Sequence, residues 1–170
     1  MKIIADTHTH TLASTHAYST ILENAKFAKE TGMVYLAMTD HAPSLTDAPH
    51  LWHFHNLRVL PEEIYGVKIL KGCEVNILNK NGDLDMDFSD EHCDLLNWIV
   101  TSFHSPTCEP MSVQDTTNAY LNIAKNPRVD VIGHSGTASY EYDYETAIKA
   151  FRDNNKLVEI NEASFNIRQE

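Results

Sequence analysis

The feature that most constrains the fold is an alternation of short apolar runs with amphipathic segments of helical length. Strands are predicted for "KIIAD", "MVYLAMTDH", "GVKILKGCEVNIL", "WIVTSFH", "VDVIGH" and "KLVEIN". The near-continuous apolar run of "MVYLAMTDH" is typical of a strand covered on both faces. Helices are predicted for "TILENAKFAKETG", "SVQDTTNAYLNIAKN" and "YETAIKAFRDNN". Thr20 and Glu23 have capping-box spacing, Gly32 stands where a C′ residue would, and Ser112 is the expected cap of the second helix. This order implies parallel strands and an α/β fold, either an open sheet or a barrel.

Three local signals refine this picture. "NGD" at Asn81 to Asp83 predicts a hairpin-type turn. The segment from Ala42 to about Leu57 is the one long irregular region. Only about six strands are visible in 170 residues, whereas ~250 residues are typical of a complete eightfold barrel.

Polar residues of the metal-ligand type recur where successive predicted strands end. They are Asp6, His8 and His10, then Asp40 and His41, then Glu74, His104 and His134. In α/β barrels the carboxyl ends of the strands form the face on which the active site is assembled. The pattern therefore favours a barrel over an open sheet.

His8 and His10 give the first chemical hypothesis. Two side chains separated by one residue on an extended segment point to the same side, so both imidazoles can reach one ion. Neutral imidazole is the commonest metal ligand, and carboxylates complete sites for zinc, manganese or iron. An isolated H-x-H is a weak signal, but several strands that all end on such residues indicate a polynuclear site. Glu74 is suited to bridging two ions, and the histidines argue against magnesium or calcium.

The charge balance limits the partners. With 24 acidic and 13 basic residues the formal net charge is −11, which disfavours nucleic acid and anionic membranes as partners. Bound metal ions would still attract a phosphate, and such ions lower the pKa of bound water and clamp phosphoryl oxygens. The three cysteines are odd in number and form no C-x-x-C pair. Together with the lack of a signal-peptide apolar region, they predict a cytoplasmic protein with reduced thiols.

Several motifs in order carry a family resemblance. "DTHTHTLASTHAYS", "TDH", the strand with Glu74, "FHSP" and "GHSG" resemble successive motifs of the PHP (polymerase and histidinol phosphatase) domain. "STHAYST" and "DAPHLWHFHN" resemble its small stand-alone bacterial phosphatase branch, and the similarity extends to "VEINEASF". The resemblance implies one domain over residues 1–170, a distorted (β/α)7 barrel, and two to three divalent transition-metal ions. Zinc is the usual ion, with manganese or iron as alternatives. The implied activity is hydrolysis of a small phosphate monoester by a metal-activated hydroxide.

The resemblance also distributes the ligands. His8 and His10 would hold one ion, Glu74 would bridge it to a second ion held by His104 and His134, and the third ion would be held by His16 and His41. Glu74, His104 and His134 would be the catalytic residues. Glu159 and Asn161, which share a face at the end of the sixth strand, are placed to hydrogen-bond ligands. For His50, His53 and His55 two interpretations stay open: a lid that recognises substrate, or a loop folded over its own aromatic residues.

One family motif has no counterpart. The family carries an Asp-x-His after a further strand, and Asp143 and Asp153 do not match it because they fall before or within the last predicted helix. We therefore expect the final strand and helix to be missing and the third ion to be weakly held or completed from elsewhere. The natural chain would be longer, or these residues would form a homo-oligomer through an open barrel edge. The alternatives to a phosphatase are an impaired metal-binding fragment and a phosphodiesterase or nuclease.

Overall fold

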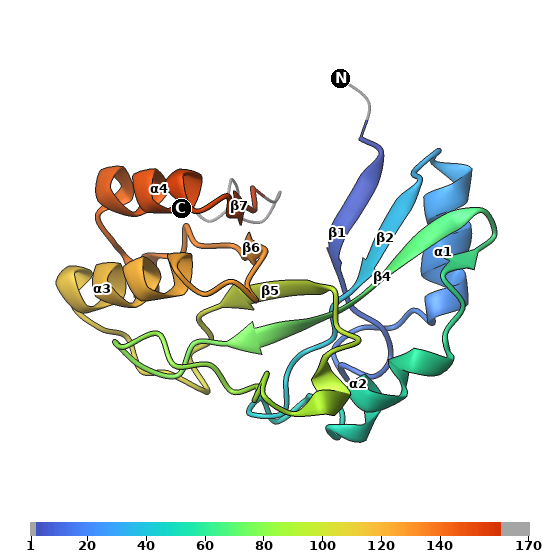
Figure 1. Cartoon of the computed structure of the whole chain (residues 1–170), viewed down its shortest axis with the longest axis horizontal. Helices are drawn as coiled ribbons and strands as arrows, with labels where there is room; N and C mark the ends of the chain where they lie inside the picture. The colour runs from blue at the N-terminus through green and yellow to red at the C-terminus, as the bar shows by residue number, and fades with distance from the viewer. Residues whose placement is uncertain (1–2, 161–170) are drawn as a thin grey trace. The chain divides into compact units, whose positions relative to one another are not determined.

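Parallel strands alternate with helices in each of the two compact units into which the chain divides (Figure 1). The computed structural model describes residues 3–160, so Asn161 and the end of "VEINEASF" lie outside the described residues. The first unit consists of Met1–Glu74 and Met86–Ile99, and the second of Val75–Asp85 and Val100–Glu170.

The first unit contains β1, β2, β3 and most of β4. Its elements are β1 (Ala5–Thr9), α1 (Ile21–Glu30), β2 (Tyr35–Met38), α2 (Trp52–Asn56), η1 (Leu57–Val59), β3 (Glu63–Ile64), β4 (Val67–Asn76) and η2 (Glu91–Cys93). β1 pairs in parallel with β2, and β2 pairs in parallel with β4. β3 is antiparallel to β4. The predicted parallel ladder is confirmed, but the bounds predicted for its first strand are wrong, because β1 begins at Ala5, and Ile3 and Ile4 before it are 69% and 53% exposed.

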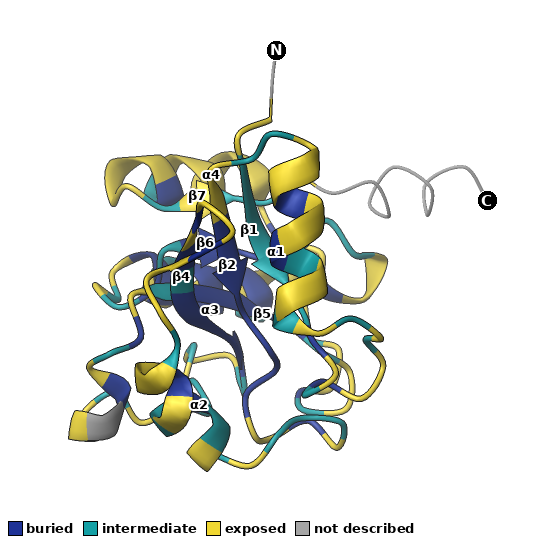
Figure 2. Ribbon diagram, turned by 90° about the vertical axis from the view of Figure 1, so that its right-hand side faces the viewer, coloured by how far each residue is buried: buried dark blue, intermediate teal, exposed yellow. Residues whose placement is uncertain are grey.

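Local capping determines where helix α1 begins, and packing determines which of its faces is buried. The Thr20 side chain accepts from the Glu23 N–H while the Glu23 carboxylate accepts from the Thr20 N–H, so the predicted capping box is confirmed. The apolar residues of this segment, Ile21, Leu22, Ala25, Phe27 and Ala28, predict a broad buried stripe. This prediction is partly wrong, because Phe27 is 64% exposed. The small residues Ala25 and Ala28 are buried instead, within a core formed with Leu36, Met38, Ile64, Val67 and Ile69. Figure 2 shows the resulting exposed outer face of α1.

Strand β1 has an irregular register at the point where the histidines begin. Asp6 pairs with Leu36 and Thr9 with Met38, so three steps along β1 match two along β2. The extra residue is a bulge, a feature that bends a strand and re-aims side chains next to functional sites. It falls at His8.

The second unit repeats the pattern around an aromatic core. Its elements are β5 (Trp98–Ser102), which enters from the first unit, α3 (Val113–Ala124), β6 (Val131–Ile132), η3 (Ala138–Tyr140), α4 (Tyr144–Asp153) and β7 (Leu157–Val158). β5 pairs in parallel with β6, and β6 with β7. The ring of Tyr120 on α3 packs edge-on against Phe103 and Phe151. The predicted Ser112 cap is confirmed, and Asp143 caps α4, a structural role for a residue that does not match the missing motif.

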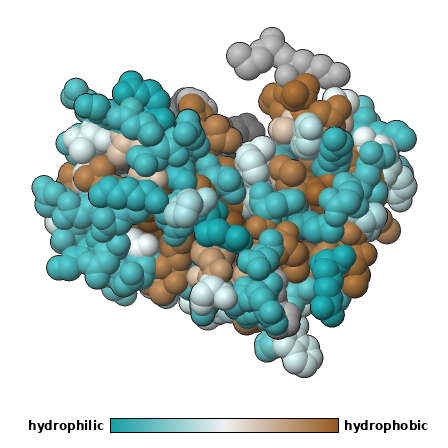
Figure 3. Space-filling model, viewed as in Figure 1, coloured by the Kyte–Doolittle hydropathy of each residue, from teal (hydrophilic) through white to brown (hydrophobic). Residues whose placement is uncertain are grey.

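The predicted α/β class is confirmed, and the strand–helix alternation is that of part of a (β/α) barrel. The turn at "NGD" is also confirmed, because Ile77 and Leu84 form an antiparallel bridge around it and Gly82 has φ +77°. The prediction that the segment from Ala42 to about Leu57 is irregular is wrong in one respect, because this segment contains the short helix α2. Hydrophilic residues cover much of the face seen in Figure 3. None of the helices within residues 3–160 has the length and apolar character needed to cross a bilayer.

Candidate metal centre

Three imidazoles of the first unit converge on one carboxylate oxygen. Glu74 Oε2 lies 3.1 Å from His8 Nε2, 3.4 Å from His10 Nε2 and 3.0 Å from His41 Nδ1. The Glu74 side chain is 1% exposed, and those of His8 and His41 are 8% and 7% exposed. The prediction that His8 and His10 point to the same side is therefore confirmed, since both reach the same oxygen.

Backbone pairing brings His41 to Glu74. The two residues form an isolated parallel bridge that continues the pairing of β2 with β4. The Glu74 N–H donates to Asp40 O at 3.1 Å, and the Ala42 N–H donates to Glu74 O at 2.8 Å. The cluster is thus fixed by the carboxyl ends of adjacent parallel strands, where barrel sites are assembled.

Asp40 organises the loop that follows β1. Its carboxylate accepts from the Thr11 N–H at 2.7 Å, from the Ser14 hydroxyl at 2.9 Å and from the Thr11 hydroxyl at 2.8 Å. The Ser14 oxygen accepts in turn from the His41 N–H at 3.0 Å, and His53 Nε2 lies 3.2 Å from the Asp40 carboxylate. Burial acts to raise the pKa of Asp40, but hydrogen bonds led by the one from His53 outweigh it and bring the pKa to about 2. Asp40 is therefore ionised at neutral pH, and it holds in place the loop of residues 11–16 that carries His16, the ligand loop.

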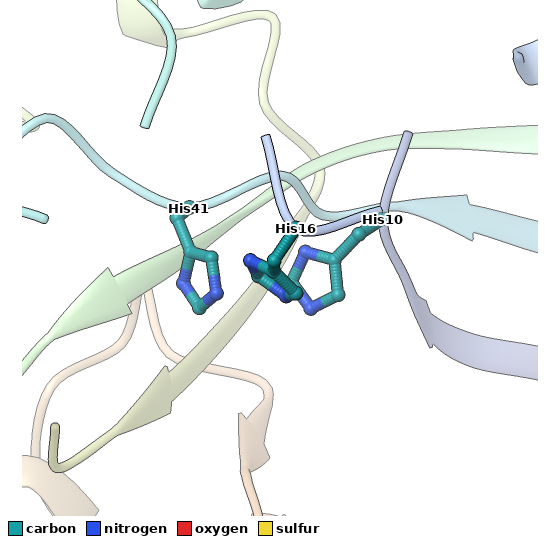
Figure 4. A group of neighbouring side chains, drawn as sticks. All are labelled: His10, His16 and His41. Carbon is teal, nitrogen blue, oxygen red and sulfur yellow. The ribbon is translucent and has the colours of Figure 1, made fainter. Parts of the chain in front are cut away.

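His16 completes a group of imidazoles that face one another (Figure 4). The His10 ring stacks on the His41 ring with centroids 4.6 Å apart, and His16 lies 5.4 Å from His10 and 5.1 Å from His41. His16 differs from the others because its side chain is 54% exposed and its Nδ1 contacts the Asp47 carboxylate. It is a peripheral member of the cluster.

The electrostatics of the cluster suit a cation. Burial lowers the pKa of His10 and of His41, and the opposing pull of the Glu74 carboxylate does not cancel it. Both imidazoles are therefore neutral at neutral pH and offer lone pairs. His10 Nδ1 is buried and makes no hydrogen bond within residues 3–160. One nitrogen atom from each of His10, His16 and His41 lies within 4.8 Å of the others, as do His8, His10 and Glu74 atoms. A shared ion is the chemical state that satisfies such donors together, so the residues fit the expected metal.

The second unit positions His104 through a relay of hydrogen bonds. Asn76 Oδ1 lies 2.7 Å from His104 Nδ1, and Asn76 Nδ2 donates to the Asp85 carboxylate at 2.6 Å. Because the amide nitrogen faces Asp85, its oxygen faces the ring, and His104 Nδ1 carries the proton. Nε2 then keeps its lone pair, which is the arrangement that partners of metal-bound histidines produce.

His134 lies beside His104 in the same unit. The ring centroids are 5.3 Å apart, and the His134 N–H donates to Glu159 Oε2 at 2.7 Å. Its φ of +23° is unusual for a residue with a side chain. Strained backbone of this kind gathers at functional sites. The Glu159 carboxylate thus accepts a hydrogen bond from the backbone of His134, a predicted ligand residue.

The predicted site residues fall into two groups, each described within its own unit. His8, His10, His16, His41 and Glu74 come together in the first unit, and His104 and His134 in the second. The roles of Asp40, Asp47 and Asn76 were not predicted from the sequence. Asp40 stands in the "TDH" motif and Asn76 two positions after Glu74, so both could have been found as strand-end residues; nothing in the sequence marks Asp47.

A cavity of about 670 Å³ in the first unit adjoins the ligand loop. It is lined by Thr11, Thr20, Ile21, Met38, Trp52, His53, His55, Asn56, Leu57, Arg58, Val59 and Leu60. His53 and His55 thus face the cavity, whereas the His50 ring packs edge-on against Trp52 at 5.5 Å. His50 therefore fits the interpretation of a loop folded over its own aromatic residues, and the lid interpretation stays a prediction for His53 and His55.

A buried cluster of imidazoles and one carboxylate at the ends of parallel strands defines an α/β protein with a candidate transition-metal centre. The family model described as PHP domain matches residues 6–163, and the chain belongs to this family. The resemblance found in the motifs is thereby confirmed.

Relatives with assigned names are close in sequence. A "Probable phosphatase" from Aliivibrio fischeri (strain MJ11) is 47% identical over 165 residues, which cover 96% of this chain and 65% of that protein. One from Acetivibrio thermocellus is 46% identical over 169 residues, with 99% and 69% covered. One from Clostridium novyi (strain NT) is 45% identical over 165 residues, with 97% and 67% covered. The chain therefore spans about two thirds of the length of these relatives.

Proposed function

We propose that this chain carries the metal centre of a phosphatase that hydrolyses a small phosphate monoester. The observation that carries the proposal is the convergence of His8, His10 and His41 on Glu74 Oε2. The names of the relatives, all probable phosphatases, agree with it.

Two to three divalent transition-metal ions would be held, zinc first, with manganese or iron as alternatives. Following the motif resemblance, His8 and His10 would hold one ion and Glu74 would bridge it to a second. His104 and His134 would serve that second ion, and His16 and His41 a third. When bound, such ions lower the pKa of coordinated water and neutralise phosphoryl oxygens.

The residues of the chain itself supply position and protonation state. Asn76 keeps the proton of His104 on Nδ1, which leaves Nε2 as a donor atom. Asp40 fixes the loop with Thr11 and Ser14, and through Ser14 it orients the backbone of His41. These contacts hold the ligands in one geometry before any substrate arrives, which is how a site avoids reorganisation during the reaction.

The cavity beside the ligand loop is the proposed place for the organic part of the substrate. Its volume of about 670 Å³ is within the range of small-molecule sites, ~300–1,000 Å³. Its lining is mainly apolar, with Arg58, His53 and His55 as basic groups in a chain of net charge −11. An anionic substrate with an apolar portion suits this lining better than a nucleic acid, for which a long basic groove is needed.

A panel of phosphate monoesters and diesters, assayed with the purified full chain, tests the proposal. We expect zinc- or manganese-dependent release of phosphate from at least one monoester, abolished by a chelator and restored by the ion. The matched control is Arg58→Gln, which we expect to raise KM with little effect on kcat. Turnover of diesters alone would contradict the monoester proposal, and bound metal without any turnover would favour the impaired metal-binding fragment.

A further inference from the structure

A second group of metal-type donors lies in the first unit and shares no residue with the cluster at Glu74. It consists of His55 on α2 with Asp90 and Cys93 on the turn that contains η2. One donor atom from each lies within 4.8 Å of the other two. His55 Nε2 and Asp90 Oδ2 are 3.5 Å apart.

The spacing of Asp90 and Cys93 explains why both side chains face His55. The Cys93 N–H donates to Asp90 O at 2.8 Å, which closes a turn of the 3-10 type. In that geometry the side chains at positions i and i+3 eclipse one another. The D-x-x-C segment therefore presents a carboxylate and a thiol on one side, opposite the imidazole.

Burial makes the thiol a defined part of this group. Cys93 is 1% exposed, whereas the side chains of His55 and Asp90 are 17% and 31% exposed. The Cys93 sulfur is 3.6 Å from the sulfur of Met86, which is itself buried. The buried Cys93 sulfur would thus bind a metal ion from the protein interior. The ion would enter from solvent between the imidazole of His55 and the carboxylate of Asp90.

We propose that His55, Asp90 and Cys93 form a separate zinc-type site that ties α2 to the turn at residues 90–93. Metal–ligand distances of about 2.0–2.3 Å put ligand atoms about 3.3–3.8 Å apart in a tetrahedron. The pair at 3.5 Å already meets this requirement, and the upper limit of 4.8 Å for the group requires a movement of about one ångström. On binding, the Cys93 thiol releases its proton to water, and the fourth position is left to water.

An ion bound to His55, Asp90 and Cys93 would stabilise one wall of the cavity beside the ligand loop. His55 lines the cavity of about 670 Å³ and also a second one of about 540 Å³ shared with Arg58, Glu91, Asp94 and Leu95. Fixing the His55 ring would hold α2, and α2 also carries His53, which contacts Asp40. The site would therefore stabilise the fold of the cavity wall without supplying a ligand to the Glu74 cluster.

Cobalt substitution of the full chain distinguishes this site from the Glu74 cluster. The protein is stripped of metal under reducing conditions and titrated with Co²⁺ alone, then with Zn²⁺. A cysteine thiolate bound to Co²⁺ gives a sulfur-to-cobalt charge-transfer band in the near ultraviolet, and the imidazole and carboxylate ligands of the other cluster give none. We expect this band in the wild type, its loss on adding Zn²⁺, and its absence from Cys93→Ser.

The controls separate the site from other thiols and from misfolding. Cys73→Ala, which removes the thiol next to Glu74, should keep the band, as should Cys108→Ser in the second unit. If Cys93→Ser does not fold, His55→Gln replaces it, and there we expect Co²⁺ binding in the charge-transfer titration to weaken at least about tenfold. No band in the folded wild type, or a band lost in Cys73→Ala, or one unchanged in Cys93→Ser or in His55→Gln, would overturn the proposal. Phosphatase activity is not the readout, so a failure of the proposed function would leave this result unaffected.

Discussion

In the first unit several imidazoles converge on one buried carboxylate, whereas in the second unit two histidines are each held by a hydrogen bond that they donate to a polar neighbour. The Glu74 carboxylate is approached by His8, His10 and His41 within 3.4 Å. His104 is oriented by Asn76, and the backbone of His134 by Glu159. The first region depends on burial and strand pairing, the second on hydrogen-bond direction. Substitutions and changes of pH should therefore impair the two regions by different mechanisms.

The largest effect is expected from Glu74→Gln. The amide keeps the shape of the side chain but removes the negative charge that binds cations, at a position 0% exposed. Because outer partners of metal ligands are already worth about 10–100-fold, we expect the phosphatase rate to fall by more than about 100-fold, with metal lost. Steady-state kinetics and elemental analysis measure this. A rate within a few-fold of the wild type would remove Glu74 from the centre of the first region.

Acidification of the metal-free chain should destabilise the first region in two steps. His10 and His41 have pKa values lowered by burial from 6.5, so below pH 6.5 the unfolded state binds more protons and stability falls. Asp40, with a pKa of about 2 against 3.8 when unperturbed, adds stability that is present above pH 3.8 and lost as the pH falls toward 2. That second step amounts to on the order of 2 kcal/mol.

Urea unfolding at a series of pH values, in the presence of a chelator, measures both steps. Asp40→Asn is the matched control, because it should remove the contribution of Asp40 to the lower step and keep the upper one. A free energy of unfolding that does not change between pH 7 and pH 5 would show that the buried imidazoles are not neutral in the folded chain.

An intermediate effect is expected from Asn76→Ala in the second unit. The substitution leaves His104 in place but removes the acceptor that fixes its proton on Nδ1. We expect metal affinity and kcat to fall by about 10–100-fold. Asn76→Asp combined with Asp85→Asn, which keeps an acceptor oxygen for His104 and reverses the hydrogen bond to residue 85, should restore part of the loss. Equal defects in the two variants would show that Asn76 acts through packing alone.

The smallest effect is expected from His16→Ala. This side chain is 54% exposed and paired with Asp47 at the edge of the cluster. We expect a loss of activity below about tenfold, well short of that of Glu74→Gln. A loss of activity as large as that of Glu74→Gln would show that His16 is a central ligand and not a peripheral one.

What the sequence predicts correctly is mostly local. The Thr20–Glu23 box, the Ser112 cap and the shared direction of His8 and His10 each depend on residues within three positions of one another. The parallel strands follow from the apolar runs, and their ends carry the ligands. Family membership follows from motif order.

What the sequence leaves open depends on distant contacts. The exposure of Phe27 reflects which face of α1 meets β2, a choice made by the small residues Ala25 and Ala28. Asp40 meets Thr11 across 29 positions, and Asn76 meets His104 across 28. Helix α2 lies in a segment that contains three histidines and shows no strong helical pattern, and its side chains are placed by the cavity they line.

Metal content tests the central claim most directly. The wild-type chain, purified without added metal, and Glu74→Gln are compared by elemental analysis at equal amounts of folded protein. We predict at least two equivalents of zinc, manganese or iron in the wild type and a loss of at least one in the variant. The difference between the two chains is independent of the site at Cys93. Less than one equivalent in the folded wild type, or the same content in both chains, would contradict a metal centre built around Glu74.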